Sequence, residues 1–199
     1  MVILVPFIII FIIFTYIYRL KFNKMPYSSL YMSGEILTRA KEQGEGISNM
    51  KLQKLLYIAN GLYLAKNGTP LIEEPIKAWT YGPVIENVYH EYKQYGNENI
   101  TKIPWEYQLN NSKIKLDNNV NEVVDFVLEV AKKLSAIQLS NWTHAEKSPW
   151  SKAKLQGNTI ISEKDIKDFF VQFLPKENIA DDTISIDTPD NPEITNSTL

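Results

Sequence analysis

Apolar residues recur every three or four positions through most of the middle of the chain, which predicts helices rather than strands. The clearest case is the segment 49–68, where Ser48 occupies an N-cap position and Gly68 the usual left-handed position after a helix. The segment 121–135 shows the same spacing, carried mainly by valines. Further helices are predicted within 28–44, 83–96, 135–143 and 162–173. We therefore expect about six helices.

Strand signals are short. Ile76, Ala78 and Thr80 alternate with Lys77 and Trp79, which predicts one short strand. A second short strand is expected beside it at 113–116, within an irregular, Asn-rich stretch over 96–119. Pro83 suits the first turn of the helix over 83–96, and 146–153 is predicted to be a turn. The expected fold is mainly α, with at most a small two- or three-stranded antiparallel sheet.

The N-terminal segment is different in kind, because Val2 to Tyr18 carries no charge. Seventeen residues are the lower limit for crossing a bilayer, and Arg19 and Lys21 follow the run. If it inserts, the positive-inside rule places the body in the cytoplasm, anchored to the inner membrane. The alternative is that translation starts at Met25, which would make residues 1–24 a misassigned leader. Both interpretations remain open.

Charge divides the chain into three parts. Residues 1–24 have a net charge of +3, residues 25–174 have 17 basic and 17 acidic side chains, and residues 175–199 have a net charge of −5. The last part has three prolines and no aromatic residue, so we expect an acidic disordered tail. It serves either as a solubilising end or as a handle for a basic partner or a protease. The body, 25–174, is predicted to be one domain.

Composition removes many functions. A neutral body disfavours nucleic acid as the main partner, because such binding needs a basic surface. The absence of cysteine excludes disulfides, zinc ribbons, iron–sulfur clusters and thiol catalysis. With only His90 and His144, and without a Gly-rich phosphate loop or a GxSxG motif, we expect no cofactor and no metal.

Two constellations stand out from this background. In 78–84, two large aromatic residues precede a Gly-Pro pair, and in 139–150 a predicted short helix ends at a histidine and is followed by Ser-Pro-Trp. Glycine permits unusual backbone angles, proline fixes φ, and the aromatic rings must either pack or be displayed. Structural packing explains both on physical grounds alone, and display to a partner is the alternative.

The order of three blocks resembles a known family. KLQKLLY at 51–57, then EPIKAWTYGPVIENVYHEYK at 74–93, then LSNWTHAEKSPWSKA at 139–153 resemble the SocA-like antitoxin family, also called the Panacea domain. The resemblance covers roughly residues 28–174. It implies a mostly helical, phage-associated or toxin–antitoxin domain that neutralises a cognate toxin by direct protein contact, without catalysis. In part of the family the antitoxin is thought to present its toxin to a protease.

The resemblance also supplies candidate residues. A hydrophobic leader is not part of the family pattern, which favours Met25 as the start. We expect Trp79, Gly82, Pro83, His144 and Trp150 mainly to shape the fold, and Tyr81 to carry binding, since hot spots favour Trp, Tyr and Arg. The full set of candidate partner-binding or motif residues is Lys51, Lys54, Tyr57, Trp79, Tyr81, Gly82, Pro83, His144 and Trp150.

Two other functions remain open from the residues alone. One is a hydrolase that uses His144 with Glu146 or Glu86. The other is a DNA-binding regulator of its own operon, for which the neutral body predicts weak, salt-sensitive binding.

Overall fold

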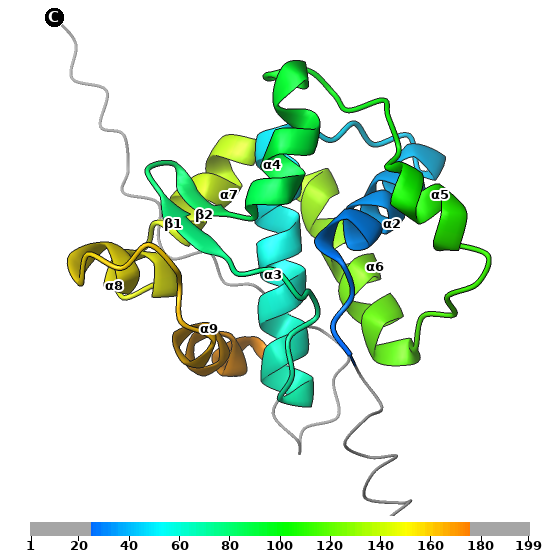
Figure 1. The fold of residues 1–199 in the computed structure, drawn as a ribbon. Helices are drawn as coiled ribbons and strands as arrows, with labels where there is room; N and C mark the ends of the chain where they lie inside the picture. The colour runs from blue at the N-terminus through cyan, green and yellow to red at the C-terminus, as the bar shows by residue number, and fades with distance from the viewer. Residues whose placement is uncertain (1–24, 176–199) are drawn as a thin grey trace, which may run out of the picture.

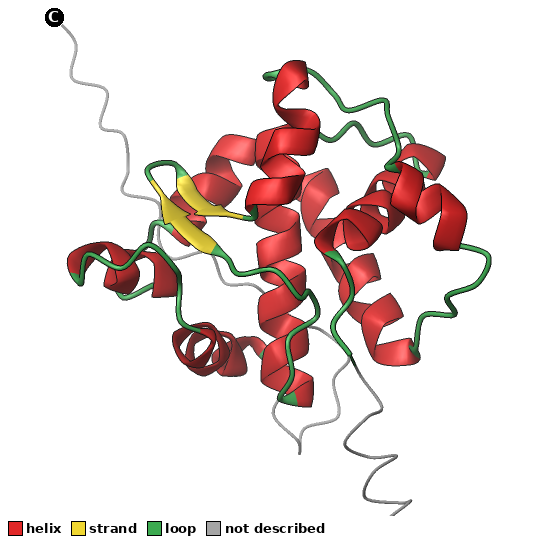
Figure 2. Ribbon diagram, in the orientation of Figure 1, coloured by secondary structure: helices red, strands yellow, loops and turns green. Residues whose placement is uncertain are grey.

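The long helix α3 (Asn49–Asn67) is the centre of the fold, and the other elements pack around it (Figure 1). The structure is a computed structural model and describes residues 25–175. In that range it contains eight α-helices, two short 3₁₀ helices and one two-stranded antiparallel sheet (Figure 2). The prediction of a mainly α domain with a small sheet is confirmed, although it named about six helices.

The buried position of α3 follows from its sequence. The Ser48 side chain accepts a hydrogen bond from the Lys51 backbone N–H, and Gly68 ends the helix with φ 76°. Every residue from Leu52 to Leu64 is buried. A helix that is buried on all sides needs neighbouring elements that cover each of them.

Four helices surround α3 much as the apolar spacing predicts. Their bounds are Ser29–Glu42 (α2), Asn118–Lys133 (α6), Ala136–Thr143 (α7) and Glu163–Phe170 (α9). Ser135 and Gln138 form a capping box at the start of α7, and the Ser162 hydroxyl caps α9 by accepting from the Asp165 N–H. These side chains satisfy backbone N–H groups that have no partner inside the helix.

Two short helices occur where none was predicted. The irregular stretch contains α5 (Trp105–Asn110), whose Tyr107 ring packs 5.3 Å from that of Tyr31 on α2. The expected turn contains α8 (Pro149–Leu155), which Ser148 caps. Helices of six or seven residues are marginal alone, so tertiary packing decides whether they form. Ser148 followed by Pro149 was nevertheless a recognisable start signal.

The sheet differs from the prediction in its second strand. β1 (Lys77–Trp79) pairs with β2 (Gly82–Val84) as a tight hairpin, with Ala78 opposite Pro83. The stretch 113–116 forms no strand. Pro83 therefore lies in a strand, and α4 (Glu86–Tyr92) begins three residues later, followed by η1 (Lys93–Tyr95).

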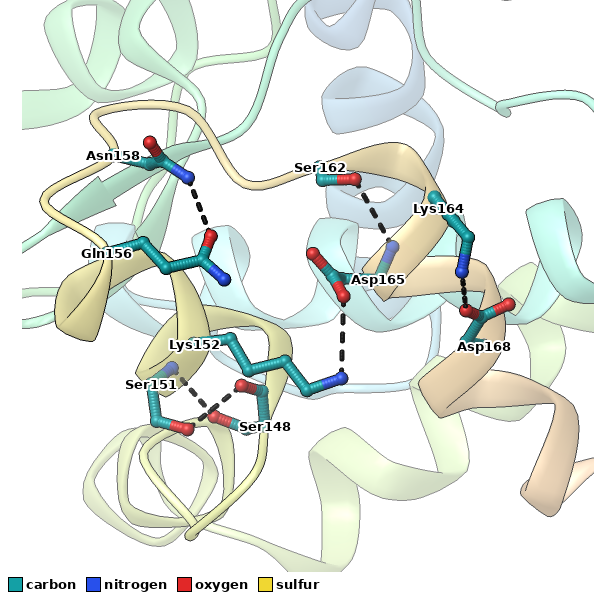
Figure 3. A network of polar contacts seen from close by, with 9 residues as sticks. All are labelled: Ser148, Ser151, Lys152, Gln156, Asn158, Ser162, Lys164, Asp165 and Asp168. Carbon is teal, nitrogen blue, oxygen red and sulfur yellow. Dashed lines mark hydrogen bonds and ion pairs between the residues drawn. The ribbon is translucent and has the colours of Figure 1, made fainter.

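Aromatic rings and a polar network attach the C-terminal elements. Trp142 on α7 packs against Phe169 and Phe170 of α9 and against Phe173 of η2 (Val171–Phe173). Figure 3 shows Lys152 of α8 pointing to Asp165 of α9, with 3.4 Å between the charged atoms. Such a half-exposed pair contributes little, so the aromatic contacts around the buried Phe170 hold this corner together.

The predicted leader and anchor at 1–24 and the predicted tail beyond residue 175 lie outside the described residues. Between residues 25 and 175, no helix is long and apolar enough to cross a membrane.

Candidate functional site

A buried lysine holds the hairpin in place by hydrogen bonds to its backbone. Lys54 on α3 is 1% exposed, and its Nζ donates hydrogen bonds to the carbonyl oxygens of Tyr81, at 2.8 Å, and Pro83, at 3.0 Å. Within the described range it forms no ion pair. Burial lowers the pKa of the Lys54 ammonium from its ordinary value of 10.5 to about 7. The amine therefore stabilises the turn by donating hydrogen bonds to its two carbonyl oxygens.

The residue between those two carbonyls must be glycine. Gly82 has φ +104°, a region that residues with a side chain rarely adopt. A Cβ added there would lie 2.5 Å from Lys54 Nζ and 3.1 Å from Thr143 Oγ1. The close approach of hairpin, lysine and α7 thus requires the absence of a side chain.

Residues of the second constellation, 139–150, also form hydrogen bonds to the hairpin backbone. Trp150 Nε1 donates to the Trp79 carbonyl oxygen at 2.8 Å, and the Trp150 ring centroid lies 4.0 Å from that of His144. The Ser140 hydroxyl, on α7, donates to the Tyr81 carbonyl oxygen at 3.3 Å. The two sequence constellations, far apart in the chain, therefore meet around one turn.

His144 is placed as a packing residue in this arrangement. Its Nε2 is buried without a hydrogen-bond partner in the described range, and burial together with the nearby Lys54 charge lowers the pKa of the imidazole. No hydrogen bond or ion pair joins it to Glu146 or Glu86 within residues 25–175, and Glu86 pairs instead with Lys77 at 2.5 Å. The geometry brings no carboxylate to this histidine.

A cleft of about 580 Å³ opens beside the hairpin. Its walls come from the first turns of α3, from the hairpin, and from α4 with the turn that follows it. The rings of Trp79 and Tyr89 meet edge to face, with centroids 5.0 Å apart. At the tip of the hairpin Tyr81 is 78% exposed. The Gln53 side chain fixes one wall by accepting from the Ile85 N–H at 2.8 Å.

Most of the predicted site residues gather here, and two do not. Lys51 is on the first turn of α3, where its Nζ pairs with Glu45 at 2.9 Å. Tyr57 is buried against Phe170, with ring centroids 5.5 Å apart. The residues that come together around the hairpin are Lys54, Trp79, Tyr81, Gly82, Pro83, His144 and Trp150.

Sequence reasoning missed several residues of the cleft. Tyr89 is not among the predicted site residues, although it stands in the resemblance block, on a predicted helix, six residues after Pro83. Lys93 and Lys154 also line the cleft, and nothing in the sequence distinguishes them from other surface lysines. Only the path of the chain brings these two lysines to one opening.

Comparison with known proteins finds a family and a relative that the chain resembles in sequence. The profile of the family described as "Antitoxin SocA-like, Panacea domain" matches residues 52–151, a range that includes Lys54, the hairpin, His144 and Trp150. The chain is 32% identical over 146 residues to the protein named "Antitoxin SocA" of Caulobacter vibrioides (strain NA1000 / CB15N), covering 68% of this chain and 78% of that relative. No solved structure matches the chain.

Proposed function

This chain belongs to the family of SocA-like antitoxins with a Panacea domain, and on that premise we propose that it neutralises a cognate toxin by binding it directly. It does so as a cytoplasmic protein-binding module without catalysis. The observation that carries the proposal is the exposed tip of the hairpin, Tyr81, held rigidly beside the cleft.

Rigidity is what makes this tip suited to binding. Tyr81 is exposed, while its own carbonyl oxygen accepts hydrogen bonds from both Lys54 and Ser140. A tyrosine with a fixed backbone loses little entropy on binding and offers a large amphipathic surface. Tyrosine is also among the residues that dominate interface energetics. The hairpin tip is therefore the proposed hot spot for the toxin.

The charge and the placement of His144 support binding over the two alternatives. Residues 25–174 are neutral overall, which favours a packed protein interface over a phosphate backbone. His144 contacts Trp150, and no carboxylate in the described part of the chain reaches it. Trp79, Gly82, Pro83, His144 and Trp150 then act by shaping the hairpin that carries Tyr81.

Co-expression with the product of the adjacent gene tests the proposal. The unaltered protein should restore growth and co-purify with that product. Tyr81→Ala should weaken the complex by about 30-fold or more, as expected for a hot-spot tyrosine. Trp105→Ala is the matched control, because Trp105 is 67% exposed on α5, away from the hairpin, and should leave the affinity unchanged.

The outcomes separate the parts of the proposal. If the adjacent product is harmless and forms no complex, the antitoxin function is wrong. If the complex forms but only Trp105→Ala weakens it, the toxin binds elsewhere than the hairpin.

A role as protease adaptor is the finer form of the same proposal. It predicts that the half-life of the toxin in cells shortens when the antitoxin is present, and that the shortening disappears on removal of the protease. A toxin that is neutralised but equally long-lived would leave binding as the whole mechanism.

A further inference from the structure

The cleft beside the hairpin carries an unbalanced charge. Three lysines line it, Lys54, Lys93 and Lys154, and none of the lining residues from the described part of the chain is acidic. Lys93 and Lys154 are exposed and form no ion pair within residues 25–175. The carboxylate of Glu86, in an adjoining hollow with Lys154, is already paired with Lys77. The cleft is therefore suited to an occupant with carboxylates.

The rest of the lining is apolar and aromatic. Trp79, Tyr89 and Val84 provide walls without charge, so the occupant should also bring aliphatic side chains. Both features occur together in residues 176–199, which contain six acidic residues and one lysine. Within them, the run Ile184-Ser185-Ile186-Asp187 alternates apolar and polar residues. In an extended segment side chains two positions apart lie on the same side, so the isoleucines share a side with the carboxylates of Asp182 and Asp190.

The length of the segment allows it to reach the cleft. The described chain ends at Pro175, directly after η2, which packs against α3. Eight extended residues, from 176 to 183, span roughly 26–29 Å before Ile184. A domain of this size has a radius of gyration of about 15 Å. Tethering also gives an effective concentration on the order of millimolar, so weak contacts suffice for occupancy.

We propose that the cleft binds the chain's own acidic segment 176–199, with Ile184 and Ile186 against Trp79 and Tyr89 and the flanking carboxylates facing Lys93 and Lys154. The bound segment covers the cleft beside Tyr81 in the free protein. A partner that uses the hairpin must displace it. This inference goes beyond the proposed function, because it concerns the free chain and holds whichever protein the hairpin binds.

NMR of the free protein tests the inference directly. The full chain is compared with a chain that ends at Pro175, and the resonances followed are the Trp79 indole N–H and the Gly96 amide, both at the cleft. We expect both to shift on truncation and to return when a synthetic 176–199 peptide is added. The peptide affinity should fall at least fivefold between 50 and 300 mM salt, because the contact is largely electrostatic.

Charge reversal gives the control and the rescue. Lys93→Glu with Lys154→Glu should weaken the peptide at least fivefold, whereas Lys113→Glu with Lys115→Glu makes the same charge change at exposed positions outside the cleft and should have no effect. A peptide with Asp182→Lys and Asp190→Lys should bind the cleft variant better than the unaltered peptide does.

Several results would overturn the inference. One is a Trp79 resonance that is unchanged by truncation, and another is a peptide that binds both double variants equally. A cleft that responds only when a toxin is added would assign it to the partner instead. None of these results bears on whether the protein is an antitoxin.

Discussion

Substituting Gly82 by alanine should destabilise the protein through two separate effects. The first is backbone strain, because φ +104° costs a residue with a Cβ of order 1–3 kcal/mol. The second is steric, because the new Cβ would lie 2.5 Å from Lys54 Nζ and must push it away. Displacing Nζ breaks its hydrogen bonds to the Tyr81 and Pro83 carbonyl oxygens, worth about 0.5–1.5 kcal/mol each. The expected total loss is about 2–6 kcal/mol.

A second glycine separates the two effects. Gly44 also has positive φ, at 76°, but no atom of residues 25–175 lies within 4 Å of a Cβ added there. Gly44→Ala should therefore cost only the strain, about 1–2 kcal/mol. Both variants are measured by urea unfolding at pH 7, with the free energy of unfolding as the readout. The difference between the two losses of unfolding free energy is the contribution of the Lys54 hydrogen bonds at Gly82.

A double-mutant cycle assigns the excess to Lys54. Lys54→Met removes Nζ and leaves an aliphatic chain of similar reach. In that background Gly82→Ala should cost about 1–3 kcal/mol less than in the unaltered protein. Equal costs in the two backgrounds, or a Gly82→Ala variant as stable as Gly44→Ala, would refute the idea that Lys54 holds the hairpin.

Two more predictions follow from buried groups. Because burial lowers the pKa of Lys54 to about 7 in the folded state, the unfolded chain binds more protons above that pH. The free energy of unfolding should then rise by up to about 1.4 kcal/mol per pH unit between pH 7 and 9, and Lys54→Met should remove this slope in urea titrations at several pH values. The Tyr57 hydroxyl is buried without a partner among residues 25–175, while its ring packs on Phe170. In thermal unfolding, Tyr57→Phe should stabilise the protein by about 1 kcal/mol, and Tyr57→Ala should destabilise it by about 3–5 kcal/mol. A destabilising Phe variant would show that the hydroxyl has a partner.

The contact between distant parts of the candidate site was not predictable. Its residues were singled out from sequence, but as two separate constellations, one around Gly82 and one around His144. Nothing in the spacing says that Trp150 Nε1 donates to the Trp79 carbonyl oxygen, because the two residues lie 71 positions apart. Lys54 was expected as a motif residue. Its hydrogen bonds to the hairpin form only when the hairpin packs against α3. Nothing in the sequence distinguishes Lys93 and Lys154, the exposed lysines of the cleft, from other surface lysines.

Local interactions explain why some elements were predicted correctly. The start and end of α3 depend on Ser48 and Gly68, and the start of α7 on Ser135, all within a few residues of the backbone groups they satisfy. The same reasoning placed Pro83 in a helix, where the structure has a strand. Its position is decided by pairing with Ala78 and by the hydrogen bond that its carbonyl oxygen accepts from Lys54.

The sequence by itself determined the helical class, the long buried helix, the capped ends and the family, because these depend on periodicity, on contacts within one turn, and on residues in a recognisable order. Tertiary structure alone decided which short segments became α5 and α8 and which side chains surround the hairpin. These outcomes depend on contacts between residues tens of positions apart, whose energies exist only once the chain has closed on itself.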